Sequence, residues 1–103
     1  MDIDSMRQAA AQAGALLRAL GNEDRLLLLC QLSQHEMSVG ELAQTLGIRQ
    51  PTLSQQLGVL RQEGLVSTRR AGKQIYYAVS DEKALTVLST LYQLYCPAPG
   101  AIL

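Results

Sequence analysis

The chain carries SVGELAQTLGIRQPTLSQQLGVLR from Ser38 to Arg61, which is two short helical patterns separated by a glycine. Ser38 followed three residues later by Glu41 is typical of a capping box at the start of a helix. Gly47 ends that helix, and Pro51 suits the first turn of the next one. Two short helices joined by a tight turn form a helix-turn-helix, which we predict here.

The second helix of this unit is expected over about residues 51–63. Leu53, Leu57 and Leu60 share one face, which we expect to be buried. The opposite face carries small polar and amide side chains, which can hydrogen-bond base edges in a DNA major groove. The predicted DNA contacts from this region are Gln50, Thr52, Ser54, Gln55 and Arg61. A solvated amphipathic helix has the same pattern, but the capped helix and short turn before it favour DNA reading.

A basic β-hairpin is predicted directly after this helix. Residues 65–70 and 73–79 read as two strands, with Ala71 and Gly72 as the turn. A basic hairpin tip in this position is a wing that contacts phosphates or the minor groove. The predicted wing contacts are Arg69, Arg70, Lys73 and Gln74. The alternative is that these charges only solvate the hairpin, and it is disfavoured because no acidic residue balances them.

Charge is unevenly distributed along a chain of zero net charge. Residues 49–74 hold five basic residues and one acidic residue, a net +4, and the remainder holds four basic and eight acidic residues, a net −4. A local basic surface on a neutral protein is typical of a footprint for phosphates.

Helices are expected on both sides of the helix-turn-helix. The first, over residues 5–20, places small and apolar residues at helical spacing, and the second contains four consecutive leucines and should be central and buried. Residues 33–37 read as a polar connection, and the last helix runs from Ser80 or Asp81 to about Tyr95 with apolar residues on more than one face. We expect a homodimer through the first and last helices, although core packing within one protomer explains the first helix equally well. The predicted dimer residues are Leu16, Leu17, Leu20, Leu88, Leu91, Tyr92 and Tyr95.

One domain is expected over residues 1–96, followed by a flexible tail over residues 97–103, which begins Pro-Ala-Pro-Gly. No apolar run reaches the roughly 18 residues that a membrane span needs. The acidic start MDIDSM is not typical of a signal peptide, so we expect a cytoplasmic protein without a membrane partner. In a reducing compartment a bond between Cys30 and Cys96 would be switchable rather than permanent.

Residues for catalysis or metal binding are few. His35 is the single histidine, no Gly-rich phosphate loop is present, and no nucleophile, base and acid can be assembled. We therefore expect that the protein is not an enzyme and binds no cofactor. Two cysteines and one histidine do not complete a closed four-ligand zinc site within one protomer, so no metal is expected.

The predicted fold is mainly α with a small β-hairpin: two helices, a helix-turn-helix, a winged hairpin and a last helix. The sequence ELAQTLGIRQPTLSQQLGVLRQEGLVSTRRAGKQIYYAV, from Glu41 to Val79, resembles the ArsR/SmtB-type winged-helix repressors, and the similarity extends over essentially the whole chain. Cys30 in LLLLCQL and Cys96 in LYQLYC are similar to the cysteine pair of the persulfide-sensing BigR/SqrR subgroup. The thiolates and the His and Asp ligands of the metal-sensing branches are missing from residues 41–46 and 81–96.

This resemblance implies a dimeric repressor that binds operator DNA and releases it when an inducer modifies the protein. It also implies a link within one protomer between Cys30 and Cys96. Taken singly, each cysteine is more typical of a small core side chain than of a sensor.

The reach of the two side chains bears on which inducer acts. A disulfide needs Cα atoms within about 7 Å, but the axes of packed helices lie about 8–10 Å apart, so a direct bond between the two cysteines is disfavoured. Each sulfur inserted between them adds about 2 Å of reach. We therefore hypothesise that sulfane sulfur donors build a polysulfide bridge between Cys30 and Cys96, with Arg25 and His35 as nearby groups that favour a thiolate. Three alternatives stay open: a repressor that senses peroxide or another thiol oxidant, a regulator with incidental cysteines, and a protein-interaction module.

Overall fold

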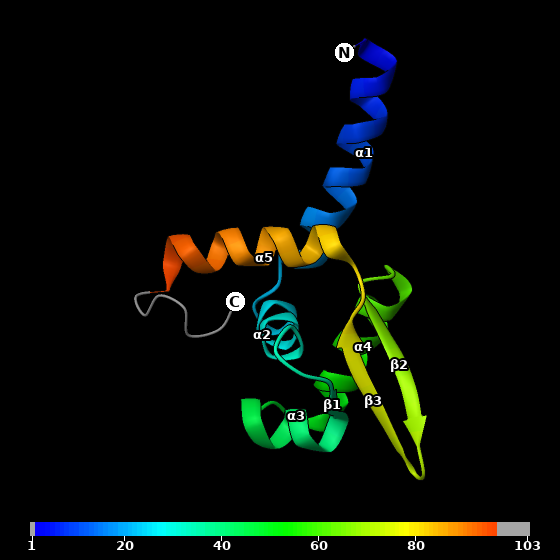
Figure 1. The fold of residues 1–103 in the computed structure, drawn as a ribbon, viewed down its shortest axis with the longest axis vertical. Coiled ribbons are helices and arrows are strands. Elements are labelled where there is room, and N and C mark those ends of the chain that lie inside the picture. The colour runs from blue at the N-terminus through cyan, green and yellow to red at the C-terminus, as the bar shows by residue number, and fades with distance from the viewer. Residues whose placement is uncertain (1, 97–103) are drawn as a thin grey trace.

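The computed structural model describes residues 2–96, so the predicted tail over residues 97–103 lies outside the described residues. The elements are α1 (Ile3–Leu20), α2 (Glu23–Leu32), β1 (Met37–Ser38), α3 (Val39–Leu46), α4 (Gln50–Gln62), β2 (Val66–Ala71), β3 (Gln74–Val79) and α5 (Glu82–Tyr95). Figure 1 shows α2, α3 and α4 packed below α5, the β2–β3 hairpin beside them, and α1 rising away from the body. The mainly helical, winged helix-turn-helix architecture predicted from the sequence is confirmed.

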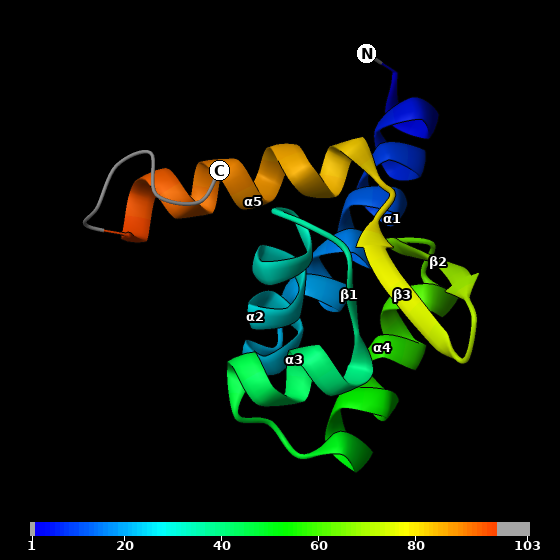
Figure 2. The same ribbon diagram turned by 60° about the horizontal axis from the view of Figure 1, so that its bottom comes forward.

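The core is formed by leucines from the helix-turn-helix and the helix before it. Leu53, Leu57 and Leu60 of α4 are fully buried, as their spacing predicts. They join Leu42 of α3 and the central leucines of α2 in one cluster. Figure 2 shows α2, α3 and α4 lying beside one another around it. Burying a leucine side chain stabilises a fold by roughly 1.5–3 kcal/mol, so this cluster fixes how α4 stands on α2.

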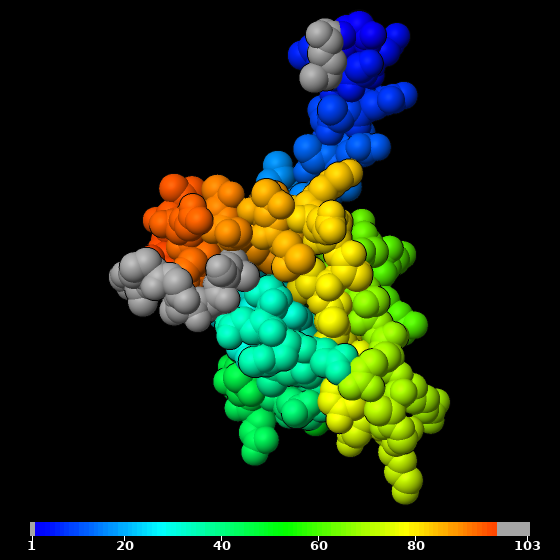
Figure 3. Space-filling model, in the orientation of Figure 1, coloured from blue at the N-terminus to red at the C-terminus, as the bar shows by residue number. Residues whose placement is uncertain are grey.

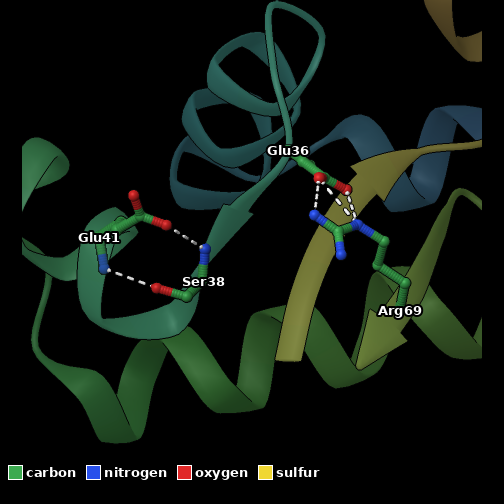
Figure 4. Close-up of polar contacts among 4 residues, drawn as sticks. All are labelled: Glu36, Ser38, Glu41 and Arg69. Carbon is green, nitrogen blue, oxygen red and sulfur yellow. Dashed lines mark hydrogen bonds and ion pairs between the residues drawn. The ribbon is translucent and has the colours of Figure 1, made fainter. Parts of the chain in front are cut away.

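The start of α3 confirms the predicted capping box. The Ser38 Oγ accepts a hydrogen bond from the Glu41 N–H (3.2 Å), and Glu41 Oε1 accepts one from the Ser38 N–H (2.9 Å; Figure 4). At the other end Gly47 takes the left-handed conformation with φ of 69°, which a residue with a Cβ adopts only under strain. The turn between α3 and α4 is therefore set by local chemistry.

The sheet is larger than the predicted hairpin. Its three antiparallel strands have the order β1-β3-β2, with Met37 opposite Tyr77 and Ser38 opposite Tyr76. The interpretation of residues 33–37 as a polar connection is thus wrong at Met37, which is buried in a strand. A strand of two residues has no periodicity of its own, because its extended form depends on pairing with β3.

The wing turn, the start of α1 and both ends of α4 shift by one or two residues from the predictions. Ala71 pairs with Gln74, so Gly72 and Lys73 form the two-residue turn, and Gly72 supplies the positive φ of 63°. The first helix starts at Ile3 because the Asp2 carboxylate accepts a hydrogen bond from the Ser5 N–H (2.7 Å). No helix among residues 2–96 is long and apolar enough to cross a membrane.

The apolar face of α1 has little cover within one protomer. Only Ala19 and Leu20, at its C-terminal end, are buried, whereas Leu17 is 62% exposed. Figure 3 shows this helix extending beyond the rest of the molecule. The periodicity of α1 therefore has two explanations along its length. Leu16, Ala19 and Leu20 pack against the protomer core, and the face before Gly14 stays exposed.

Replacing Ser38 by alanine removes the side-chain acceptor at the start of α3. We expect Ser38→Ala to lower the free energy of unfolding by about 1 kcal/mol, since the cap is buried and the Glu41 N–H loses its acceptor. Urea unfolding followed by circular dichroism measures this. Ser80→Ala, at an exposed serine, is the control and should change stability by less than about 0.5 kcal/mol. Equal effects of both variants would contradict the capping role.

Candidate nucleic-acid interface and thiol pair

One side of α4 is available for contact with DNA because the other is buried. The buried stripe of leucines leaves Gln50, Ser54, Gln55 and Arg61 exposed to solvent. Thr52 is only half-buried, at the edge of the stripe. The structure thus places four of the five predicted contacts of this helix on its solvent side.

The wing brings the other predicted contacts to one tip. Arg70, Lys73 and Gln74 are exposed around the turn between β2 and β3. The Arg70 guanidinium reaches back to the Gly72 carbonyl (3.4 Å), which keeps its charge at the tip. In Figure 1 this tip extends beyond the helices.

Arg69 differs from its neighbours because it has an acidic partner. Its Nε donates to both carboxylate oxygens of Glu36 (2.8 Å each), and Nη2 also donates to Oε1 (Figure 4). The guanidinium also lies over the Tyr76 ring, 4.9 Å from its centroid. The expectation that no acidic residue balances the wing charges is therefore wrong at this position.

The Glu36–Arg69 pair ties the wing to the segment after α2. The hydrogen bonds from Arg69 lower the pKa of Glu36 and raise the pKa of Arg69. Both side chains are largely exposed, so water screens the attraction, but the bidentate geometry orients the guanidinium. Arg69 thus braces the base of the wing, whereas the charges of Arg70 and Lys73 face solvent.

The two cysteines lie on different helices, and neither is in a disulfide. Cys30 is half-buried on α2, where its carbonyl accepts a hydrogen bond from the Ser33 hydroxyl (2.6 Å). Cys96 caps the end of α5 and is exposed, and its N–H donates to the Tyr92 carbonyl (2.9 Å). Burial raises the pKa of the Cys30 thiol, and negative charge on Cys96 raises it further. Charge on Cys96 therefore disfavours the thiolate of Cys30.

The predicted help from Arg25 and His35 is not found. Arg25 directs its guanidinium to two carbonyls of α1 and to Gln56, and His35 is exposed. Neither contributes to the pKa of Cys30, which is raised rather than lowered. Proximity in sequence is misleading here. Arg25, five residues before Cys30 on α2, lies on another face of the helix, and His35 lies in the connection after α2 ends at Leu32.

The predicted dimer residues divide into two groups. Leu20, Leu88 and Tyr92 are 4%, 1% and 7% exposed and belong to the protomer's own core. Leu17 and Tyr95 are 62% and 79% exposed. Leu16 and Leu91 are intermediate between these groups. A dimer contact predicted for this chain therefore rests on the second group and its partly buried neighbours.

A groove of about 500 Å³ runs along α1. Its walls are the alanine-rich side of α1, the connection from α4 to β2 and the start of α5, including Ala13, Leu16 and Leu65. The charged side chains of Glu63, Asp81 and Lys83 also line it. Within residues 2–96, no three His, Cys, Asp or Glu side chains come together as metal ligands.

Comparison with known proteins agrees with this arrangement. Residues 22–68 match the bacterial regulatory proteins of the arsR family. The biofilm growth-associated repressor of Agrobacterium fabrum is 49% identical over 94 residues, which is 91% of this chain and 80% of that protein. The chain belongs to the ArsR family. As an ArsR-family protein it is a DNA-binding transcriptional repressor and not an enzyme.

Two solved structures of ArsR-type regulators superpose closely. The transcriptional repressor BigR from Xylella fastidiosa is 47% identical with a TM-score of 0.86, over 95% of this chain and all of that chain (100%). Reduced HlyU from Vibrio cholerae is 40% identical with a TM-score of 0.87, over 91% of this chain and 99% of that chain. The similarity therefore extends beyond the matched family region, which already contains Cys30, to α5, the helix that ends at Cys96.

Sequence reasoning missed two residues that belong to this arrangement. Glu36 falls within the predicted polar connection, and Gln56 lies beside Gln55 without being singled out. A signal is present for Gln56, since it lies three residues after Leu53 and four before Leu60, at the helical spacing of the buried stripe. No local signal exists for Glu36, because its partner is 33 residues away.

The salt dependence of operator binding should differ between variants of the two wing arginines, Arg69 and Arg70. Arg70→Ala removes an exposed charge, so we expect weaker operator binding. The slope of log K against log salt concentration should become less negative by about 0.9 for each phosphate that the variant no longer neutralises. Arg69→Ala should flatten it less, because Glu36 already compensates this charge. Fluorescence anisotropy over a series of salt concentrations measures both slopes. Equal flattening would show that Arg69 contacts phosphate directly.

The thiols should differ in reactivity. In the reduced protein at neutral pH we expect iodoacetamide to modify Cys96 before Cys30, because Cys96 is exposed and burial raises the pKa of Cys30. Peptide mass spectrometry over a time course measures the two rates. Unfolding in guanidinium is the control and should remove the difference. Faster modification of Cys30 in the folded chain would contradict the assigned environments.

Proposed function

We propose that this ArsR-family repressor is a homodimer whose operator affinity is controlled by a sulfur bridge between Cys30 and Cys96. The observation that carries the proposal is the placement of the pair. One thiol caps the exposed end of α5, and the other is half-buried on α2, where it packs against the core cluster that also contains Leu88 of α5. A bond between them joins α2 to the end of α5, two helices whose buried leucines belong to one core cluster.

The bridge forms without any oxidant beyond the inducer. Each thiol takes the outer sulfur of a persulfide RSSH, which gives a cysteine persulfide and releases RSH. Attack of one cysteine persulfide on the other closes a trisulfide and releases H₂S. Two thiols and two RSSH thus give one trisulfide, two RSH and one H₂S, so atoms and electrons balance. Each sulfur added extends the reach by about 2 Å.

Contact with DNA is assigned to α4 and the wing. The four exposed side chains of α4 are placed to read bases, and Arg70, Lys73 and Gln74 to contact backbone or minor groove. In a twofold dimer the two α4 helices must match half-sites about one DNA turn, or 34–36 Å, apart. A change in how α5 stands on α2 therefore acts on affinity through that spacing.

The dimer contact is assigned to α1 and α5. Leu17 and Tyr95 are exposed, and the apolar groove along α1 is open. Large apolar side chains left exposed on α1 and at the end of α5 are typical of a protein–protein contact. A second copy that covers both Leu17 and Tyr95 brings the end of α5, and so Cys96, to the subunit interface. The proposed switch needs a compartment that keeps the thiols reduced, such as the cytoplasm.

A gel shift combined with intact-mass measurement tests this proposal. The protein is reduced, treated with a persulfide, or treated with peroxide, and each sample is mixed with DNA from upstream of its gene. We expect persulfide to add bridging sulfur and to weaken binding by about 5–150-fold, the usual range of coupling between two sites. Cys30→Ser and Cys96→Ser should bind in all three conditions.

Other results would overturn parts of the proposal. If persulfide treatment leaves binding unchanged, or if both serine variants still respond, the cysteines are incidental. If peroxide alone releases DNA equally well through a disulfide without extra sulfur, the protein is a general thiol-redox repressor. If no sample binds DNA, the interaction-module alternative is favoured.

A further inference from the structure

Arg25 joins three helices through one side chain. It lies in the first turn of α2, and its own N–H is bound by the Asn22 cap (3.0 Å). Its Nε donates to the Ala19 carbonyl (2.5 Å) and its Nη2 to the Arg18 carbonyl (2.9 Å), both in the last turn of α1. Its Nη1 donates to Gln56 Oε1 on α4 (2.9 Å).

These contacts suit an arginine and no other side chain. The last carbonyls of a helix lack partners within the helix, and the guanidinium supplies donors to two of them in one plane. A third donor remains for α4. The ammonium of lysine is a point charge with donors on one atom, so it does not reach both helices at once.

Gln56 sits where the two sides of α4 meet. Gln55, one residue before it, is exposed, and Leu57, one residue after it, is buried. Gln56 is half-buried, and its amide oxygen points toward α2. It is therefore not free to read DNA, but it holds the helix that does.

We propose that the Arg25–Gln56 hydrogen bond is a positioning contact that sets the angle of α4 relative to α1 and so determines the half-site spacing the dimer accepts. The leucine cluster holds α4 against α2 but, being apolar, resists sliding and rotation only through shape. The hydrogen bond adds a directional constraint. This inference rests on the proposed dimer through α1, because only then does the angle between α1 and α4 set the distance between the two recognition helices.

The test compares spacing discrimination among variants. Fluorescence anisotropy measures the affinity of each variant for duplexes whose two half-sites have the natural separation or one base pair more or less, and for a duplex of unrelated sequence. Gln56→Leu removes the acceptor, and Gln56→Glu keeps one. Gln62→Leu, at an exposed glutamine on the same helix, is the matched control. Arg25→Lys keeps the charge without the fork.

We expect Gln56→Leu and Arg25→Lys to reduce the preference for the natural separation by up to about tenfold, the effect of losing one hydrogen bond. Gln56→Glu and Gln62→Leu should keep that preference, even if the added charge of Gln56→Glu weakens binding to every duplex. Affinity for the unrelated duplex should be unchanged in Gln56→Leu, because no charge is lost.

The inference fails if Gln56→Leu keeps the wild-type preference. It also fails if this variant loses affinity for all the duplexes by the same factor, since the hydrogen bond would then stabilise the fold without setting the half-site spacing. Sedimentation of the wild-type chain separates this from the proposed function. A monomer refutes the dimer and the positioning role together, whereas a dimer with unaltered spacing preference in Gln56→Leu refutes the positioning role alone.

Discussion

Burial of α2 against the helix-turn-helix is the interaction on which the rest of the structure depends. Leu28 and Leu29 are completely buried, and they meet the leucine stripe of α4 within the same cluster. One helix therefore carries the support of the DNA-reading unit, the half-buried thiol of Cys30 and the guanidinium of Arg25. Because a close-packed core transmits displacement rather than absorbing it, a shift of α2 at one of these places displaces the other two.

What the sequence predicted well is what local chemistry determines. The capping box at Ser38, the left-handed turn at Gly47 and the leucine stripe of α4 each depend on residues within one or two helical turns. What it did not predict depends on contacts across the fold. β1 is extended only because β3 pairs with it, and the Glu36–Arg69 and Arg25–Gln56 contacts join residues 33 and 31 positions apart.

For the thiol pair, the sequence likewise predicted the positions of the cysteines but not their surroundings. The helical pattern predicts Cys30 within one helix and Cys96 at the end of another, and both positions are confirmed. The environments were not predictable, since burial depends on the assembled fold. Arg25 is held by α1 and α4, and desolvation raises the pKa of Cys30. Cys96 is therefore the accessible thiol, and Cys30 is the one whose modification reaches the core.

The proposed sulfur bridge changes where the recognition helices stand and leaves their own contacts intact. Anisotropy titrations of the bridged protein, before and after reduction by dithiothreitol, against operator and unrelated DNA test this claim most directly. We expect bridging to lower operator affinity reversibly while affinity for unrelated DNA, which depends on the unchanged basic surface, stays constant. A bridged protein that keeps its operator affinity, or that loses affinity for both DNAs equally, would contradict the proposed switch.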